Sequence, residues 1–145
     1  MKKIGVLFSL LLVTILITSC NETKKVIDTA GTAQLSGSYT ITGVYGATVN
    51  SKSSLTLQFT AINKTISGAS GCNQFSGNYS IDLFAINIGQ LMATEMYCDE
   101  PVMETERAYL KAISNTGSYS IVEEVLTFYS KTDRSQLLTA KKNKN

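Results

Sequence analysis

A chain of 145 residues has room for one domain with a single core, and its 43% hydrophobic residues and one Pro are typical of a folded globular protein. The formal charge of +2 and the scattered basic residues give no electrostatic basis for nucleic-acid binding. The chain contains no His, which excludes Ser-His-Asp triads, Cys-His pairs and every His-ligated metal site.

The amino terminus has the pattern of a lipoprotein signal peptide. Two lysines precede an apolar run at 4–17, which suits a signal h-region and is shorter than the roughly 20 residues that a spanning helix needs. The run ends in Ile17-Thr18-Ser19-Cys20, which resembles the lipobox of bacterial lipoproteins. We therefore predict that residues 1–19 are removed and that the acylated Cys anchors the protein to a membrane without spanning it. A cleaved secretory signal followed by a chance Cys is the alternative.

The segment after Cys20 is predicted to be a flexible tether, because residues 21–36 are polar and small and lack apolar periodicity. Asn21 follows the Cys at the position where inner-membrane retention commonly uses Asp, so in a bacterium with two membranes we expect the outer membrane. Removal of residues 1–19 takes two of the 13 basic residues and none of the 11 acidic ones, leaving 11 of each sign.

From Ser38 onward, short alternating or β-branched runs separated by Gly, Asn and Ser indicate antiparallel strands joined by turns. Asp82-Leu83 is expected to be a tight connection. The predicted strands are 38–44, 55–61, 64–69, 76–82, 84–88, 119–123, 125–130 and 136–140.

One segment changes to helical periodicity. Pro101 suits a first helical position, acidic residues follow it, and the pattern predicts a helix at 101–114 that ends near Asn115. The expected fold class is α+β, with a mainly antiparallel, strongly curved, barrel-like sheet and one packed helix. The domain is placed at 37–140, with a basic tail at 141–145.

Two segments carry a family resemblance: G-C-N-x-x-x-G-x-Y at 71–79 and T-x-M-x-C at 94–98, followed by a helix with an acidic residue. Together they resemble the META domain family, also called HslJ-like. One departure is Tyr39, where members usually have Trp in a G-x-W-x-L segment. The resemblance implies a small β-rich domain with one helix, frequently on envelope lipoproteins, and no established biochemical activity. The motif residues in this chain are Gly71, Cys72, Asn73, Gly77, Tyr79, Thr94, Met96, Cys98 and Glu104.

The motif also has a structural interpretation from its residues alone. Gly71 and Gly77 suit positions that need a positive φ or a close backbone approach, and Asn73 can bond its own backbone in a turn. With Cys20 acylated, Cys72 and Cys98 are the two remaining thiols in an oxidising compartment, so a structural disulfide is predicted, with a redox-active pair as the alternative.

The acidic stretch offers a metal or glycosidase-type site as an alternative to a helix start that the macrodipole favours. It comprises Glu95, Asp99, Glu100, Glu104 and Glu106. It lacks the ligand spacing of an EF-hand, so we expect no catalytic residue, no metal and no cofactor. The leading hypothesis is a monomeric, non-enzymatic envelope lipoprotein that binds an envelope protein or cell-wall partner or acts under envelope stress. The alternative is a carrier of a small hydrophobic ligand within the curved sheet.

Overall fold

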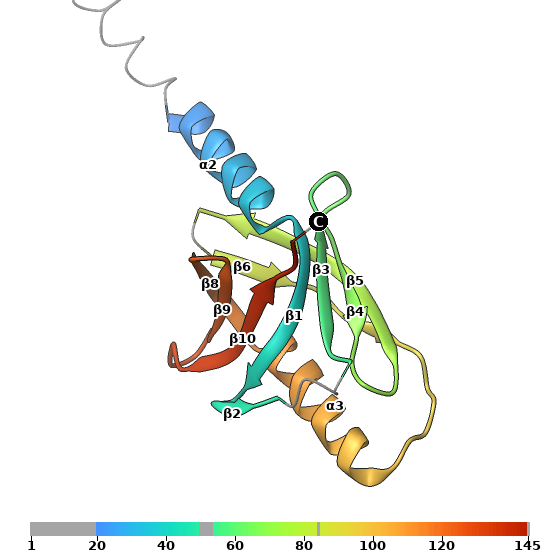
Figure 1. Ribbon diagram of the computed structural model, residues 1–145. Coiled ribbons are helices and arrows are strands. Elements are labelled where there is room, and N and C mark those ends of the chain that lie inside the picture. The colour runs from blue at the N-terminus through green and yellow to red at the C-terminus, as the bar shows by residue number, and fades with distance from the viewer. Residues whose placement is uncertain (1–19, 50–53, 84, 145) are drawn as a thin grey trace, which may run out of the picture.

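The structure is a closed antiparallel β-barrel with a helix at each end (Figure 1). The computed structural model describes residues 20–49, 54–83 and 85–144. In this part of the chain the helices are α2 (Cys20–Leu35) and α3 (Glu100–Ser114). The strands are β1 (Gly37–Val44), β2 (Ala47–Thr48), β3 (Thr56–Thr60), β4 (Thr65–Ala69), β5 (Gln74–Asp82), β6 (Ala85–Ile88), β7 (Met92–Ala93), β8 (Thr116–Val122), β9 (Val125–Ser130) and β10 (Gln136–Lys142).

The barrel closes because the first and last strands of the sheet pair with each other. Neighbouring strands follow the order β10-β9-β8-β6-β5-β4-β3-β1, and β1 pairs with β10 from Tyr39↔Lys142 to Val44↔Leu138. The two shortest strands lie outside this ring, β2 on β1 and β7 on β5. Closure removes the exposed edges that an open sheet of this size would present.

The antiparallel order gives the barrel two distinct ends. β1 starts beside α2 and runs away from it, so the β3–β4 turn, the β5–β6 turn, the β8–β9 turn and the end of β10 return to the α2 end. The loop between β4 and β5 lies at the opposite end, which α3 covers. Figure 1 shows α2 (blue) and α3 (orange) at these two ends.

The barrel interior is filled by side chains from alternate strand positions. Along β5 every second residue is buried, as the two-residue period of a strand requires. The Phe59 ring makes edge contacts with Tyr39 at 6.3 Å, Tyr79 at 5.1 Å and Phe128 at 6.1 Å between centroids. Each such buried side chain contributes about 1.5–3 kcal/mol to stability, so the hydrophobic cluster inside the barrel holds the fold together.

The predicted fold class is confirmed, and each of the eight predicted strands corresponds to a strand of the barrel. The helix expected at 101–114 is α3. β2 and β7 were not predicted, because two residues are too few to show an alternating pattern. The basic tail was placed two residues too early, since Lys141 and Lys142 belong to β10.

The segment at 21–36 that was predicted to be a flexible tether is instead helical up to Leu35. Leu35, the last residue of α2, is fully buried, and its carbonyl accepts a hydrogen bond of 2.8 Å from the Tyr39 hydroxyl. Burial, together with the neighbouring phenols of Tyr119 and Tyr79, raises the pKa of Tyr39 to about 12, which keeps this donor protonated. The end of α2 is therefore part of the folded domain. The signal peptide predicted at 1–19 lies outside the described residues.

Candidate functional site

Three motif residues, Gly71, Cys72 and Asn73, lie in the loop that joins β4 to β5 at the α3 end of the barrel. Gly71 in this loop has a φ of +105°, a backbone conformation that favours Gly, which agrees with the turn predicted there. Gly77 instead lies within β5, where an added Cβ would come within 3.0 Å of the Gln90 carbonyl oxygen and 2.9 Å of Leu91 Cδ2. Gly71 thus shapes the loop, whereas Gly77 allows the segment after β6 to approach the sheet.

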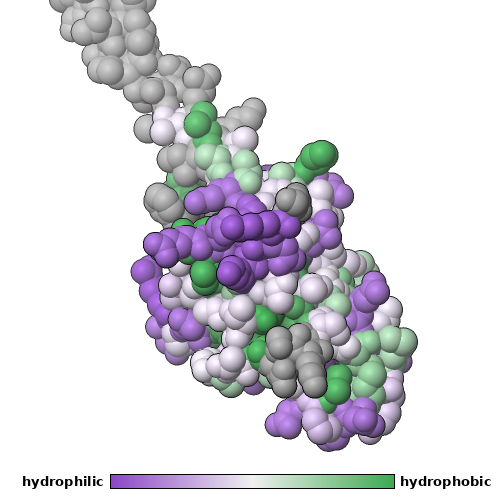
Figure 2. Space-filling model, in the orientation of Figure 1, coloured by the Kyte–Doolittle hydropathy of each residue, from purple (hydrophilic) through white to green (hydrophobic). Residues whose placement is uncertain are grey.

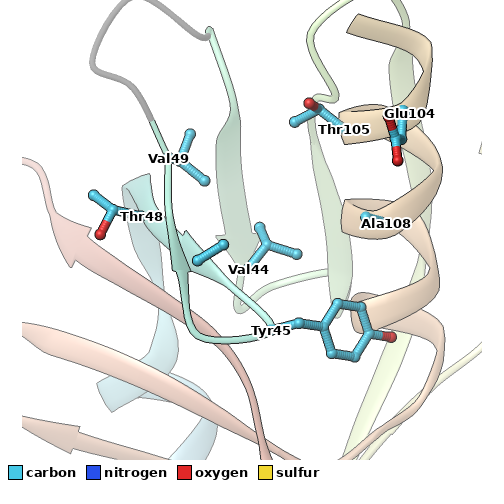
Figure 3. A pocket seen from close by; sticks show the side chains of 8 residues that line it. Val44, Tyr45, Thr48, Val49, Glu104, Thr105 and Ala108 are labelled. Carbon is cyan, nitrogen blue, oxygen red and sulfur yellow. The ribbon is translucent and has the colours of Figure 1, made fainter. Parts of the chain in front are cut away.

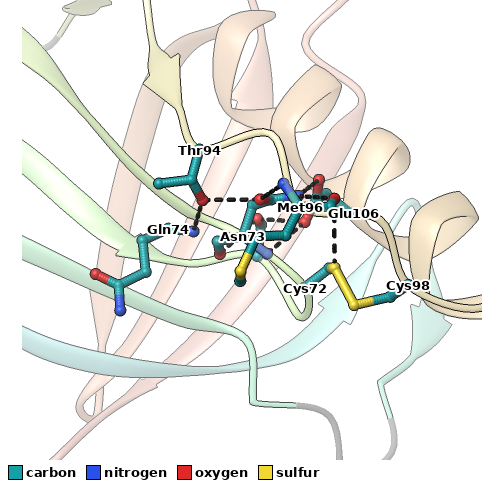
Figure 4. The surroundings of a disulfide bond; sticks show 8 residues. Cys72, Asn73, Gln74, Thr94, Met96, Cys98 and Glu106 are labelled. Carbon is teal, nitrogen blue, oxygen red and sulfur yellow. Dashed lines mark hydrogen bonds between the residues drawn. A yellow bond between two sulfur atoms is a disulfide. The ribbon is translucent and has the colours of Figure 1, made fainter.

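Asn73 connects three segments through its side chain, which is almost completely buried (Figure 4). Its Oδ1 accepts hydrogen bonds from Thr94 Oγ1 and the Met96 amide, both at 2.7 Å. Its Nδ2 donates to the Met96 carbonyl at 3.0 Å and to Glu106 Oε1 at 2.8 Å. These four bonds use the full capacity of an Asn amide. The expected bond from Asn73 to its own backbone is replaced by these longer-range contacts.

Glu106 on α3 supplies a buried carboxylate to the same cluster. Its Oε2 accepts from Ser70 Oγ at 2.7 Å and from the Asn73 amide at 2.9 Å, in addition to the bond from Asn73 Nδ2. Burial acts to raise the pKa of Glu106, but the bonds from Ser70 and Asn73 and from the backbone amides of Asn73 and Cys72 outweigh it. The pKa therefore lies below its ordinary value, and the carboxylate is ionised at neutral pH and held by uncharged donors.

The predicted disulfide between Cys72 and Cys98 is confirmed, with the two Cα atoms 5.9 Å apart. It joins the loop before β5 to the segment that leads into α3. The hydrogen bonds of Asn73 connect the same loop to α3, so the disulfide and these bonds reinforce each other. We call Ser70, Cys72, Asn73, Cys98 and Glu106 the Asn73 cluster.

The motif residues Tyr79 and Glu104 lie apart from the cluster. Tyr79 packs against Phe59 in the barrel interior, and its buried hydroxyl has no hydrogen-bond partner among the described residues. Glu104, the acidic residue taken from the family resemblance, is exposed, and the carboxylate that reaches the cluster belongs to Glu106. The helical period could have identified Glu106 from the sequence. Glu106 precedes the buried Tyr109 and Ile113 by three and seven positions, so all three lie on one face of α3.

The Asn73 cluster holds a segment whose apolar side chains point away from the protein. Tyr97 is 84% exposed and Met92 is 69% exposed, and Met96 and Val102 on the same stretch of chain are exposed as well. We call these four residues the Met-Tyr surface. Figure 2 shows hydrophobic and hydrophilic residues interspersed near the amino-terminal end of α3. Met96 thus contributes its backbone to the cluster and its side chain to the surface.

Three residues of the acidic stretch border this surface. Glu95, Asp99 and Glu100 are exposed, and Glu100 forms an ion pair with Arg107. Within the described residues, no group of three or more Cys, Asp or Glu side chains is arranged to hold a metal ion.

A pocket of about 470 Å³ lies between the β1–β2 hairpin and α3 (Figure 3). The Tyr45 ring points toward α3, and Glu104 is the one carboxylate in the lining. The lining therefore contains neither a nucleophile paired with a general base nor the two carboxylic acids of a glycosidase site. The lining residues are Val44, Tyr45, Ala47, Thr48, Val49, Glu104, Thr105 and Ala108.

The fold is shared with solved structures of low sequence identity. An NMR structure of a protein from Burkholderia xenovorans has a TM-score of 0.64 at 22% identity, covering 81% of this chain and 89% of that one. A second NMR structure has a TM-score of 0.60 at 24% identity, covering 76% and 92%. A crystal structure of a DUF4847 family protein from Bacteroides vulgatus ATCC 8482 has a TM-score of 0.55 at 14% identity, covering 77% and 95%.

The sequence comparison identifies the family. No curated protein matches the chain. The META domain model matches residues 33–144, a range that includes the Asn73 cluster, the Met-Tyr surface and the last residues of α2. This match covers most of the chain, and the chain therefore belongs to the META domain family.

Proposed function

We propose that this protein is a non-enzymatic lipoprotein of the cell envelope, anchored through Cys20, whose META domain binds a partner through the Met-Tyr surface. The observation that carries the binding role is the exposure of Met92, Met96, Tyr97 and Val102 on a segment held by a disulfide and by Asn73. Grouped exposed apolar side chains mark interaction sites more often than scattered ones do. A segment that is already ordered loses less conformational entropy on binding.

The charges around this surface indicate the chemistry of the partner. Glu95 and Asp99 flank Met96 and Tyr97 in sequence and are exposed, and the neighbouring Arg107 is already paired with Glu100. A complementary partner presents apolar side chains bordered by Lys or Arg, which can also contact the face of the Tyr97 ring. An envelope protein with an exposed basic and apolar segment fits this description, and a role under envelope stress is compatible with it.

The anchor rests on the sequence of the first 20 residues. A positive n-region, an apolar run and Ile17-Thr18-Ser19-Cys20 support acylation of the Cys. Two or three acyl chains hold a protein on a bilayer far more firmly than one does. Among the described helices, none has the length and apolar character needed to cross a membrane.

Site-specific photocrosslinking in intact cells tests the binding role. A photoreactive amino acid at Tyr97 is expected to capture one discrete envelope protein, whereas the same group at Asp133, exposed on the β9–β10 turn, is expected to capture none. The crosslinked segment should contain Lys or Arg. Changing those residues to Glu should abolish the adduct, and Glu95→Lys with Asp99→Lys should restore it. Equal capture at both positions would refute the Met-Tyr surface as the binding site.

The non-enzymatic role has its own test. A reproducible hydrolytic activity of the purified domain, lost on one change at Glu95, Asp99 or Glu104, would refute it.

The alternative function is a carrier of a small hydrophobic ligand. The packing of the barrel interior leaves little space for such a ligand. The centre of the barrel is occupied by the Tyr39, Phe59 and Phe128 rings, and α2 and α3 lie at the two ends. Native mass spectrometry of the purified protein distinguishes the two functions, because a carrier should copurify with a bound small molecule and a binding module should not.

A further inference from the structure

The α2 end of the barrel brings together segments that are distant in sequence. The chain that precedes the described residues joins the structure at Cys20, the first residue of α2. The β3–β4 turn, the β5–β6 turn, the β8–β9 turn and the end of β10 reach the same end. In Figure 1, α2 and the β3–β4 turn both project from this end, and α2 runs obliquely to the strands.

Aliphatic side chains are exposed on several of these segments. Ile62, in the β3–β4 turn, is 98% exposed, and Val122, beside the β8–β9 turn, is 65% exposed. Leu83 follows β5, and Val26 on α2 is 67% exposed. A single exposed aliphatic residue needs no explanation, but the segments at this end of the barrel expose four of them.

Basic side chains accompany these aliphatic residues. Lys64 follows Ile62 in the same turn, and Lys141, Lys142 and Lys144 lie at the end of β10. The last three line a trough of about 460 Å³ together with Thr40, Thr42 and Asn143. Figure 2 shows hydrophilic residues concentrated below α2.

Part of this charge is already engaged or opposed. Lys142 Nζ donates to the Gln34 carbonyl at 3.4 Å and lies over the Tyr39 ring. Among the side chains described on the turns at this end, the acidic ones are Asp82, Glu123 and Glu124. The positive charge that would attract an anionic surface is therefore confined to the trough. The exposed aliphatic side chains are distributed more widely over the α2 end of the barrel.

We infer that the α2 end is a membrane-docking surface, which rests on the anchoring proposed above. The occupant is the bilayer that holds the acylated Cys20, because the anchor brings this end of the barrel to the lipid at high local concentration. Ile62, Leu83 and Val122 enter the interfacial region of the bilayer, and Lys141 and Lys144 contact lipid phosphates. The domain would then lie on the membrane with the Met-Tyr surface directed away from it.

Fluorescence of the anchored protein tests this orientation. Ile62→Cys and the control Met92→Cys each add one thiol at an exposed apolar position, one at either end, while Cys72 and Cys98 remain paired. The acylated proteins, labelled with an environment-sensitive dye, are reconstituted in vesicles of phosphatidylethanolamine and phosphatidylglycerol. We expect the dye at 62 to shift to the blue and to be quenched by spin-labelled lipids, and the dye at 92 to do neither.

Charge variants test the role of the trough in the same vesicles. Lys141→Glu with Lys144→Glu should weaken the quenching at 62, whereas Lys131→Glu, on the β9–β10 turn at the other end, should leave it unchanged. Quenching at 62 that is unaffected by the pair of charge changes would overturn the assignment of the trough.

The anchor and the docking surface can fail separately. The mass of the amino-terminal peptide reports whether Cys20 carries acyl chains, and an unacylated Cys20 would overturn the anchoring and this inference together. An acylated protein with both dyes in a water-like environment would overturn the docking surface alone. Shielding of position 62 in native membranes but not in protein-free vesicles would assign this end to a protein partner, which also overturns it.

Discussion

Asn73 and Glu106 are 33 positions apart in sequence and form two hydrogen bonds, from Nδ2 to Oε1 at 2.8 Å and from the Asn73 amide to Oε2 at 2.9 Å. One residue belongs to the loop between β4 and β5, and the other belongs to α3. Their contact couples the position of the helix to the sheet and, through Thr94 and Met96, to the Met-Tyr surface.

Glu106→Gln is expected to lower the free energy of unfolding by about 1–3 kcal/mol, because it places an amide N–H group where the site offers only donors. Urea unfolding measures the change. Glu104→Gln is the matched control, since Glu104 is exposed on the same helix and its substitution should change stability by less than about 0.5 kcal/mol. Equal effects of the two substitutions would contradict the assigned role of Glu106.

Stability should fall at acidic pH partly through Glu106. Its pKa is lowered in the folded state relative to the ordinary value of 4.5, so the stabilisation is fully present above pH 4.5 and is lost as the pH falls through the folded-state pKa. Urea unfolding across this range should therefore show a smaller loss of stability in Glu106→Gln than in the native protein. Parallel pH profiles of the two proteins would show that Glu106 does not titrate with a lowered pKa.

The disulfide should contribute strongly to stability. Closing a loop with a sequence separation of 26 residues stabilises the fold by about 3–4 kcal/mol on the chain-entropy model. Cys72→Ser and Cys98→Ser are each expected to lower the melting temperature markedly, and the double variant should be no worse than either. Alkylation of both thiols in the folded, unreduced protein would refute the bridge in solution.

The end of α2 should be required for full stability of the domain. Leu35→Ala removes a fully buried side chain and should destabilise the protein by about 2–5 kcal/mol. Val26→Ala, at an exposed position of the same helix, is the control and should change stability by less than about 0.5 kcal/mol. Thermal unfolding of the soluble domain measures both. An unchanged melting temperature in Leu35→Ala would mean that this turn is not packed on the barrel in solution.

Anchoring is tested by Cys20→Ser, which should block both acylation and removal of residues 1–19, because the thiol is the acylated group. Metabolic labelling with palmitate and the apparent mass of the product report the two steps. Normal processing with unchanged membrane association would refute the lipobox assignment.

The sequence by itself determined the strands of the barrel and α3. Alternation along β5 and the apolar face of α3 are local patterns, because the period of a strand or helix decides which side chains face the core. The paired motif segments, which include Cys72 and Cys98, likewise predicted the family and the bridge without coordinates.

Only the tertiary structure decided the contacts between distant segments. The choice of Glu106 over Glu104 depends on which turn of α3 faces Asn73, and no local pattern fixes the partner of a single polar residue. α2 was missed because its polar and small residues show no apolar period, and its last turn is held by burial of Leu35 and by the Tyr39 hydroxyl. In both cases the stabilising groups come from distant parts of the chain. Local sequence patterns therefore cannot predict these contacts, which form only in the folded barrel.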